Sequence, residues 1–248
     1  MRTLSTTELL ELWEQGYGRA PVERALLLLE AACPEMPSEA LARLSIGRRD
    51  RLLMELREQT FGPQLAGLAT CPGCGERLEI ELDMAAVRAA GPAAPPEELS
   101  IQEGGYALAL RLPDSLDLAA IARAPGVADA RRLLLERCVL AVHAEDEGGG
   151  PLPAVGDVPA TVIDTAIRSL AEADPLATVE LELACPQCGC AWTALFDIVS
   201  FFWAELDAWA HRLLQDVHAL ASVYGWSEAD ILGMSPWRRQ IYLEFLGA

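Results

Sequence analysis

Two short stretches with the pattern Cys-Pro-x-Cys-Gly constrain this chain more than any other feature. They are residues 71–75 and residues 185–189. A Cys-x-x-Cys turn brings two sulfurs to one side of the chain, where the proline restricts φ and the glycine allows a positive φ. Two such turns supply four thiolates, which is the usual ligand set of a structural zinc. We therefore predict one zinc ion, bound by Cys71, Cys74, Cys185 and Cys188.

The segments beside the two turns alternate strictly between apolar and acidic residues. Residues 78–82 follow the first turn, residues 179–183 precede the second, and residues 192–196 can form a return strand. A period of two is typical of half-buried strands, so each turn is expected near the tip of a hairpin, as in a zinc ribbon. The cysteine pairs of an ordinary ribbon lie about 15–20 residues apart, whereas 110 residues separate these two pairs. We interpret the pattern as one ribbon that is split by a large insertion.

Other uses of the cysteines are open but less favoured. A redox dithiol is expected beside a βαβ pattern, which neither turn has, and disulfides require a secreted protein, whereas no signal peptide is expected here. A catalytic metal is disfavoured because four thiolates leave no open coordination position. Cys190 lies two residues beyond Cys188 and competes for a ligand position, while Cys33 and Cys138 lie in apolar helical patterns and are expected in the core.

Helical patterns dominate the rest of the chain. We expect an α+β fold that is mainly helical, with a small antiparallel sheet built around the split four-cysteine zinc ribbon. The predicted divisions are an N-terminal helical region (1–62), the split ribbon and sheet core (63–84 and 176–200), an inserted α/β region (85–175) and a C-terminal helical region (201–248).

The inserted region is expected to begin with a proline-rich linker at residues 91–96. A strand is predicted at residues 106–112, and helices are predicted at residues 128–142 and 158–173. An acidic, glycine-rich run at residues 145–151 is expected to be an exposed loop.

The longest regular helix is predicted after the second cysteine pair. Apolar residues between 203 and 224 recur at spacings of three and four, which gives an a/d seam over three heptads, and Gly225 ends the pattern. The N-terminal helices can cover this seam, and a partner protein is the alternative. Tryptophan and arginine are enriched at interface hot spots, so the candidate partner-binding residues are Trp226, Trp237, Arg238 and Arg239.

Composition and motifs exclude several classes of function. The formal charge is −18, the pI is near 4.5 and the nineteen cationic residues are all arginine, which argues against an electrostatic grip on nucleic acid or on an anionic membrane. There is no phosphate loop, dinucleotide fingerprint or Gly-x-Ser-x-Gly motif, and His143, His211 and His218 are predicted to be polar edge residues. We expect no catalytic residues, no small-molecule substrate and no membrane span, and therefore no enzyme.

Several stretches, taken in order, carry a resemblance to a known family: residues 47–53, 71–75, 111–113, 174–175, 185–189 with Trp192, 224–228 and 238–239. They resemble the baseplate hub assembly proteins of contractile-tailed phages, in the form found in phage-like contractile injection systems of bacteria. The resemblance implies a non-enzymatic assembly factor or structural adaptor whose partners are baseplate, hub or tail proteins, in the bacterial cytoplasm or in a tail-like particle. The zinc is inferred from spacing rather than from the resemblance, and Cys190 departs from the family pattern. The alternative, a zinc-ribbon regulatory protein that binds nucleic acid or the transcription machinery, is disfavoured by the acidity.

Overall fold

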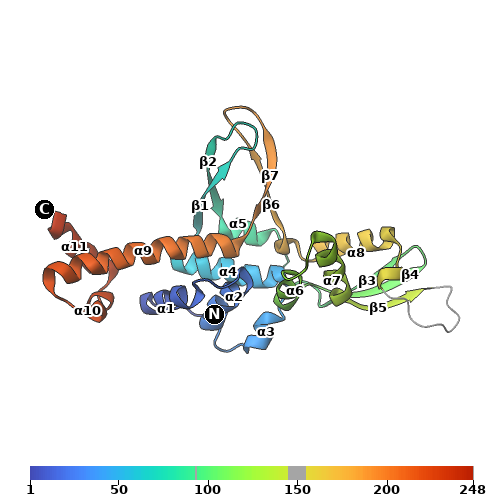
Figure 1. Cartoon of the computed structure of the whole chain (residues 1–248), viewed down its shortest axis with the longest axis horizontal. Coiled ribbons are helices and arrows are strands. Elements are labelled where there is room, and N and C mark those ends of the chain that lie inside the picture. The colour runs from blue at the N-terminus through green and yellow to red at the C-terminus, as the bar shows by residue number, and fades with distance from the viewer. Residues whose placement is uncertain (93, 145–154, 248) are drawn as a thin grey trace.

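The computed structural model describes residues 1–92, 94–144 and 155–247, so the predicted loop at residues 145–151 lies outside the described residues. The molecule is elongated, with the N-terminal helices in its middle (Figure 1). A long helix runs through this middle part and continues past it on one side, the inserted region extends on the other, and two hairpins rise together as an arm. No helix in the described ranges is long and apolar enough to cross a membrane.

Four helices form the N-terminal part, and the first turns of α1 and α4 are closed by side-chain caps that the sequence encodes. The Glu8 backbone N–H donates to Ser5 Oγ at 3.3 Å, and the Ser5 N–H donates to the Glu8 carboxylate at 2.8 Å, which is a capping box. Ser45 caps the fourth helix by accepting from the Arg48 N–H at 3.3 Å. The helices are α1 (Thr6–Gly16), α2 (Pro21–Ala32), α3 (Ser38–Ala42) and α4 (Ile46–Phe61).

These helices pack against the first half of α9 (Ile198–Tyr224), which confirms that they cover the N-terminal part of its apolar seam. Gly16 permits a close approach of α1 to α9, because a Cβ there would lie 2.0 Å from Trp203 Cη2. The main core is therefore built from segments at opposite ends of the chain. It includes Leu9, Leu12, Leu28, Leu29, Leu53, Leu56, Phe202 and Leu206.

The predicted strands form two separate hairpins. In the first, β1 (Gln64–Thr70) pairs with β2 (Arg77–Asp83), and in the second, β6 (Val179–Ala184) pairs with β7 (Ala191–Phe196). Both pairs are antiparallel, and each hairpin is a two-stranded sheet of its own. The fold class is confirmed as mainly helical with small antiparallel sheets, and the expected single sheet is divided between the two hairpins.

A three-stranded antiparallel sheet in the order β3-β4-β5 forms the centre of the inserted region, and helix α8 packs over it. The predicted strand at 106–112 is confirmed as β4, whereas the predicted helix at 128–142 was too long. It ends at Cys138, because the apolar, partly β-branched residues that follow pair with β4 as strand β5. Strand β3 was not predicted. The elements are α5 (Met84–Ala89), β3 (Glu98–Glu103), β4 (Tyr106–Arg111), α6 (Ser115–Ile121), α7 (Val127–Cys138), β5 (Val139–Ala144), the 3₁₀ turn Val155–Asp157, α8 (Ala160–Ala173) and the 3₁₀ turn Pro175–Ala177.

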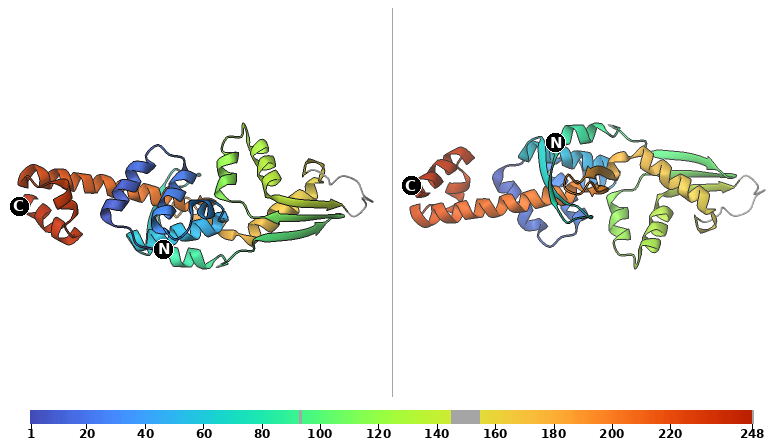
Figure 2. Two further views of the ribbon diagram at one scale, coloured as in Figure 1. Left: turned by 90° about the horizontal axis from the view of Figure 1, so that it is seen from below. Right: turned by 90° about the horizontal axis from the view of Figure 1, so that it is seen from above.

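Helix α9 extends beyond the middle part of the molecule and carries α10 (Glu228–Leu232) and α11 (Pro236–Gly247) at its far end (Figure 2). It ends as predicted at Gly225, whose φ of 68° lies in the left-handed region that glycine adopts without strain. Val217 and Leu220 of the seam pack with Ile231 of α10. The second half of the seam is thus covered by the C-terminal helices.

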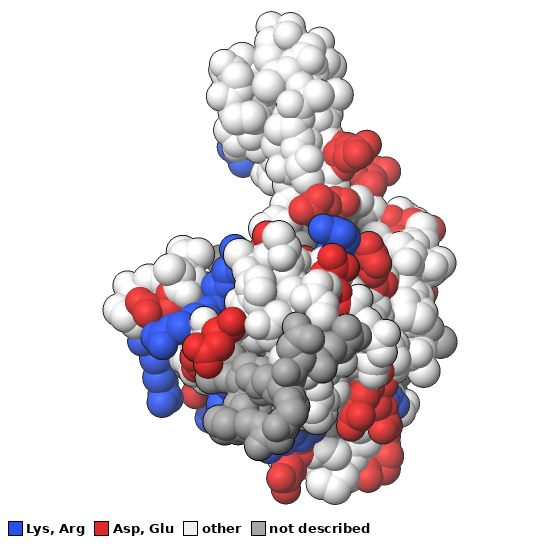
Figure 3. All heavy atoms as spheres, turned by 90° about the vertical axis from the view of Figure 1, so that its right-hand side faces the viewer, with Lys and Arg blue, Asp and Glu red and all other residues white. Residues whose placement is uncertain are grey.

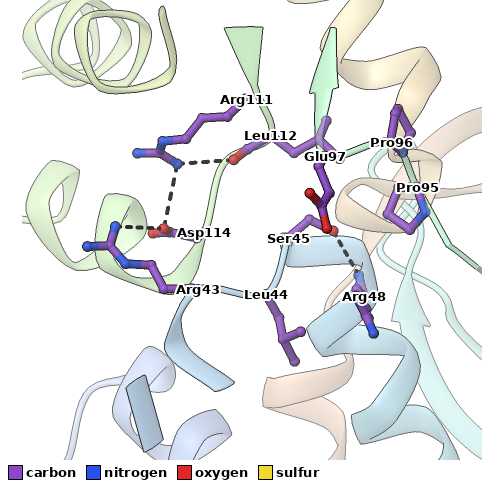
Figure 4. Close-up of a pocket in the computed structure, with 10 residues that line it drawn as sticks. All are labelled: Arg43, Leu44, Ser45, Arg48, Pro95, Pro96, Glu97, Arg111, Leu112 and Asp114. Atoms are coloured by element: carbon purple, nitrogen blue, oxygen red, sulfur yellow. Dashed lines mark hydrogen bonds and ion pairs between the residues drawn. The ribbon is translucent and has the colours of Figure 1, made fainter. Parts of the chain in front are cut away.

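A buried polar network joins the inserted region to the N-terminal helices. The Ile46 N–H donates to the Pro113 carbonyl at 3.1 Å, and the Gly47 N–H donates to the Asp174 carboxylate at 2.9 Å. Beside this junction lies a hollow of about 260 Å³. Arg43 and Arg111 approach the Asp114 carboxylate there at 3.4 and 3.5 Å, as Figure 4 shows.

Asp117 is the most enclosed carboxylate of this network, with no exposed side-chain surface. It accepts two hydrogen bonds from Arg111, at 2.7 and 2.9 Å, and one from Arg137 at 2.6 Å. The Asp114 N–H donates to it at 3.0 Å. Burial raises the pKa of Asp117, but these bonds outweigh the burial and lower the pKa to about 2.

Candidate metal centre

The two hairpins bring their turns together at the tip of the arm (Figure 1). The Sγ atoms of Cys71 and Cys188 lie 3.7 Å apart, and those of Cys74 and Cys185 lie 3.6 Å apart. All four Sγ atoms lie within 4.8 Å of one another. Side chains that are 117 and 111 positions apart in the chain are thus gathered in one cluster.

The two turns have the same backbone hydrogen bonds, as their shared sequence pattern suggests. In the first, the Gly75 N–H donates to the Cys71 carbonyl at 2.9 Å, and in the second, the Gly189 N–H donates to the Cys185 carbonyl at 2.9 Å. Gly75 and Gly189 have φ values of 77° and 72°, a region in which a side chain would be strained. The turns therefore present their sulfurs in equivalent ways.

The geometry of the cluster suits a tetrahedral metal. A Zn–S bond is about 2.3 Å long, which places the sulfurs of a tetrahedral site about 3.8 Å apart. The two measured separations, 3.7 and 3.6 Å, are close to this value. Each turn contributes one buried cysteine, Cys71 or Cys185, and one exposed cysteine, Cys74 or Cys188. The arrangement is compatible with a closed site that has four protein ligands.

The pKa values of Cys71 and Cys74 are shifted in opposite directions by their shared surroundings. Burial raises the pKa of Cys71, but the Cys74 and Gly73 backbone N–H groups and neighbouring thiols lower it to about 6. The backbone hydrogen bond at Glu76 lowers the pKa of Cys74, but Cys188, burial and the other thiols outweigh it and raise the pKa to about 12. A divalent cation would remove this conflict, because it stabilises every thiolate that binds it.

The remaining cysteines and the histidines lie outside the cluster. Cys190 is close to the first turn, since its Sγ would lie 3.3 Å from a Cβ on Gly73, but it is not among the four sulfurs that lie within 4.8 Å of one another. Cys33 packs in the main apolar core as predicted. Cys138 is also buried, but it lies near the charged groups of the Asp117 network, and burial raises the pKa of Cys138 to about 12. His143, His211 and His218 are exposed, which agrees with their prediction as polar edge residues.

The four candidate partner-binding residues divide into two buried or half-buried side chains and two exposed ones. Trp226 stacks on Tyr224 with a centroid separation of 4.4 Å, and Arg239 is buried. Trp237 is 75% exposed, and the Arg238 guanidinium lies 5.8 Å from the centre of the Tyr242 ring. Of these four residues, Trp237 and Arg238 are the exposed ones and can therefore contact a partner.

Figure 3 shows the face of the molecule at the end of the inserted region, with the arm rising above it. On this face the upper part of the arm is almost free of charged side chains, whereas acidic residues are spread over the parts below it. The charge of the chain is thus distributed unevenly, and the arm presents mostly uncharged groups on this side.

The buried polar network that joins the inserted region to the N-terminal helices was not predicted from the sequence. Asp114 and Asp117 form a capping box at the start of α6, which is a detectable local signal. Their partners Arg43 and Arg137 are separated from them in the chain, and no motif connects these arginines to the carboxylates.

Helices α2 to α4, the split hairpins, the inserted sheet and the cysteine cluster all fall within one family match, whereas α1 precedes it. Residues 17–203 match the model of the T4 bacteriophage base plate protein family. The chain belongs to this family. In this base plate family member the match includes both cysteine turns and the inserted region. Most of α9 and all of α10 and α11 lie beyond the match. No curated protein and no solved structure matches the chain.

Proposed function

We propose that this base plate family member is a non-enzymatic assembly factor or structural adaptor for the baseplate or hub of a phage tail or of a phage-like contractile injection system. Its partners are other baseplate, hub or tail proteins, and its zinc is structural. The observation that carries the proposal is the family match over residues 17–203, which includes both cysteine turns. The protein is made in the bacterial cytoplasm and enters the tail-like particle or helps to build it.

The cysteine cluster supports the metal part of the proposal. We expect the purified chain to contain close to one zinc per molecule when its elements are measured by mass spectrometry, because four convergent cysteines are the ligand set of a closed structural zinc site. Cys33→Ser is the matched control, since Cys33 lies in the helical core, and it should leave the zinc content unchanged. A fully folded wild-type protein that contains no metal would contradict the proposal.

The exposed end of α11 supports a partner contact in the C-terminal region. The double substitution Trp237→Ala with Arg238→Ala is expected to leave the chain folded, because both residues are exposed. It should weaken binding to a baseplate or hub protein by at least about 2 kcal/mol, the usual threshold for a hot spot. Circular dichroism melting and a binding titration on the same variant measure the two effects.

A matched pair on the same helix makes this test specific. Gln240→Ala with Glu244→Ala alters exposed residues of α11 without removing an aromatic side chain, and it should not change binding by more than about 0.5 kcal/mol. Unfolding of the Trp237 and Arg238 variant would assign these side chains to the core, and unchanged binding would place the interface elsewhere.

A further inference from the structure

A fifth thiol, that of Cys190, lies beside the candidate metal centre and contacts the other hairpin. Cys190 lies in the β6–β7 turn, yet a Cβ on Gly73 of the β1–β2 turn would lie 3.2 Å from Cys190 Cβ and 3.3 Å from Cys190 Sγ. The same Cβ would lie 3.6 Å from Cys188 Sγ. Because glycine has no side chain, the Cys190 side chain occupies the space beside the first turn. This contact joins two hairpins that are separate two-stranded sheets.

Cys71 is the first-turn cysteine that takes part in this contact. The Gly73 N–H donates to Cys71 Sγ at 3.4 Å, so the sulfurs of Cys71 and Cys190 both lie beside Gly73. Of the two cysteines in the first turn, Cys71 interacts more strongly with the Cys190 thiol. Cys190 is also partly exposed, which makes its thiol accessible to an oxidant dissolved in water.

The turn that contains Cys190 does not need a cysteine at this position. The Cys185 N–H donates to the Cys190 carbonyl at 2.8 Å, and in the first turn the Cys71 N–H donates to the Glu76 carbonyl at 2.8 Å. Cys190 and Glu76 are therefore equivalent positions, and only their backbones take part in the turn. The four convergent sulfurs also complete a tetrahedral site without Cys190. Its thiol is thus available for a role that neither the turn nor the metal site requires.

We propose that Cys190 and Cys71 form a disulfide when the protein meets a hydroperoxide, which links the two hairpins covalently and removes one ligand from the metal site. With hydrogen peroxide, one of the two thiols is oxidised to a sulfenic acid and one water molecule is released. The sulfur of the other thiol then displaces a second water molecule as the S–S bond forms. Two thiols and one hydrogen peroxide give one disulfide and two water molecules, so the broken O–O bond accepts one electron from each sulfur.

The disulfide keeps the two hairpins together under conditions in which the metal is lost. The three cysteines that remain of the four-sulfur cluster are an incomplete ligand set for a structural zinc. Oxidation therefore releases the ion, a consequence that rests on the proposed zinc site. The covalent link closes a loop of nearly the same length as a shared metal does, so it restricts the unfolded chain in a similar way.

The test treats the purified full chain with hydrogen peroxide and maps disulfides by tandem mass spectrometry of unreduced digests. The wild type is expected to lose two alkylatable thiols and to yield a peptide in which Cys71 is joined to Cys190. Cys33→Ser is the matched control, since Cys33 lies in the helical core, and it should yield the same cross-linked peptide. In Cys190→Ser, which cannot form this bond, zinc release measured with a chromogenic chelator should be at least about fivefold slower.

The melting temperature after oxidation, measured with a chelator present, is a second readout. The oxidised wild type should melt about 5 °C or more above oxidised Cys190→Ser, because its hairpins remain linked. A protein that is purified without metal would contradict the proposed zinc but would still allow the cross-link to be mapped, so the two proposals fail separately. The inference is overturned if the wild type forms only Cys71–Cys74, Cys185–Cys188 or Cys71–Cys188 disulfides, or if it forms none.

Discussion

Replacing Cys185 with serine is expected to lower the melting temperature of the protein by about 10 °C or more. A metal bound by the four thiolates would fasten together the two ends of the inserted segment, and closing a loop of about 110 residues in the unfolded chain costs roughly 4–5 kcal/mol by chain-entropy estimates. A structural zinc of about 10–16 kcal/mol apparent binding energy is large enough to offset this cost. In a chain of this length, each 1 kcal/mol of stability corresponds to about 2–4 °C in melting temperature.

Two comparisons isolate the role of the metal in this result. Cys190→Ser changes a neighbouring thiol that lies outside the four-sulfur cluster, so its melting temperature should stay close to that of the wild type. A strong chelator should destabilise the wild type and the Cys190→Ser variant to the same degree, and it should have little further effect on Cys185→Ser. If Cys185→Ser melts like the wild type, the cluster does not clamp the inserted segment.

Asp117→Asn is expected to destabilise the inserted region by about 3–5 kcal/mol, since it removes the charge that satisfies two arginines in a buried site. Arg111 and Arg137 both donate to this carboxylate, and its side chain has no exposed surface. Asp164→Asn is the matched control. It breaks an ion pair with Arg131 whose two side chains are 61% and 54% exposed, and such surface pairs contribute about 0–1 kcal/mol. Thermal or urea unfolding of both variants measures the difference, and equal small losses would contradict a stabilising network.

The Asp117 carboxylate also makes the free energy of unfolding depend on pH. Its pKa in the folded protein is lowered to about 2, below the value of about 3.9 expected in the unfolded chain. The unfolded state therefore binds a proton first as the pH falls, so the contribution of Asp117 is complete above about pH 5 and is lost progressively as the pH falls toward 2. Asp117→Asn should flatten this part of the unfolding profile, whereas Asp164→Asn should leave it unchanged. Identical acid profiles for the wild type and Asp117→Asn would contradict this assignment.

Local patterns in the sequence predicted much of the fold. The alternating residues at 78–82 and 179–183 lie in strands β2 and β6, and the capping box at Ser5 starts α1. Gly225 ends α9 as expected. These predictions succeeded because each depends on residues a few positions apart, whose side-chain direction, cap or φ is fixed locally.

Predictions that depended on long-range pairing were less complete. Residues 139–144 continue the apolar pattern of α7, and only their pairing with β4 makes them a strand. Strand β3 was missed in the same way, since Glu98–Glu103 is mostly polar and is recognised by its register with β4. Short segments of this kind have no decisive local preference, so the neighbouring strand determines their conformation.

The sequence by itself determined the chemistry of the candidate metal centre: two matching turns, their glycines and four thiols in equivalent positions. Only the tertiary structure decided that these turns meet, because 110 residues of inserted chain separate them and the core beneath them joins both ends of the chain. The tertiary structure also decided which arginines surround Asp117, and which of the C-terminal residues are exposed. Such contacts depend on the packing of distant elements, which no local pattern of residues specifies.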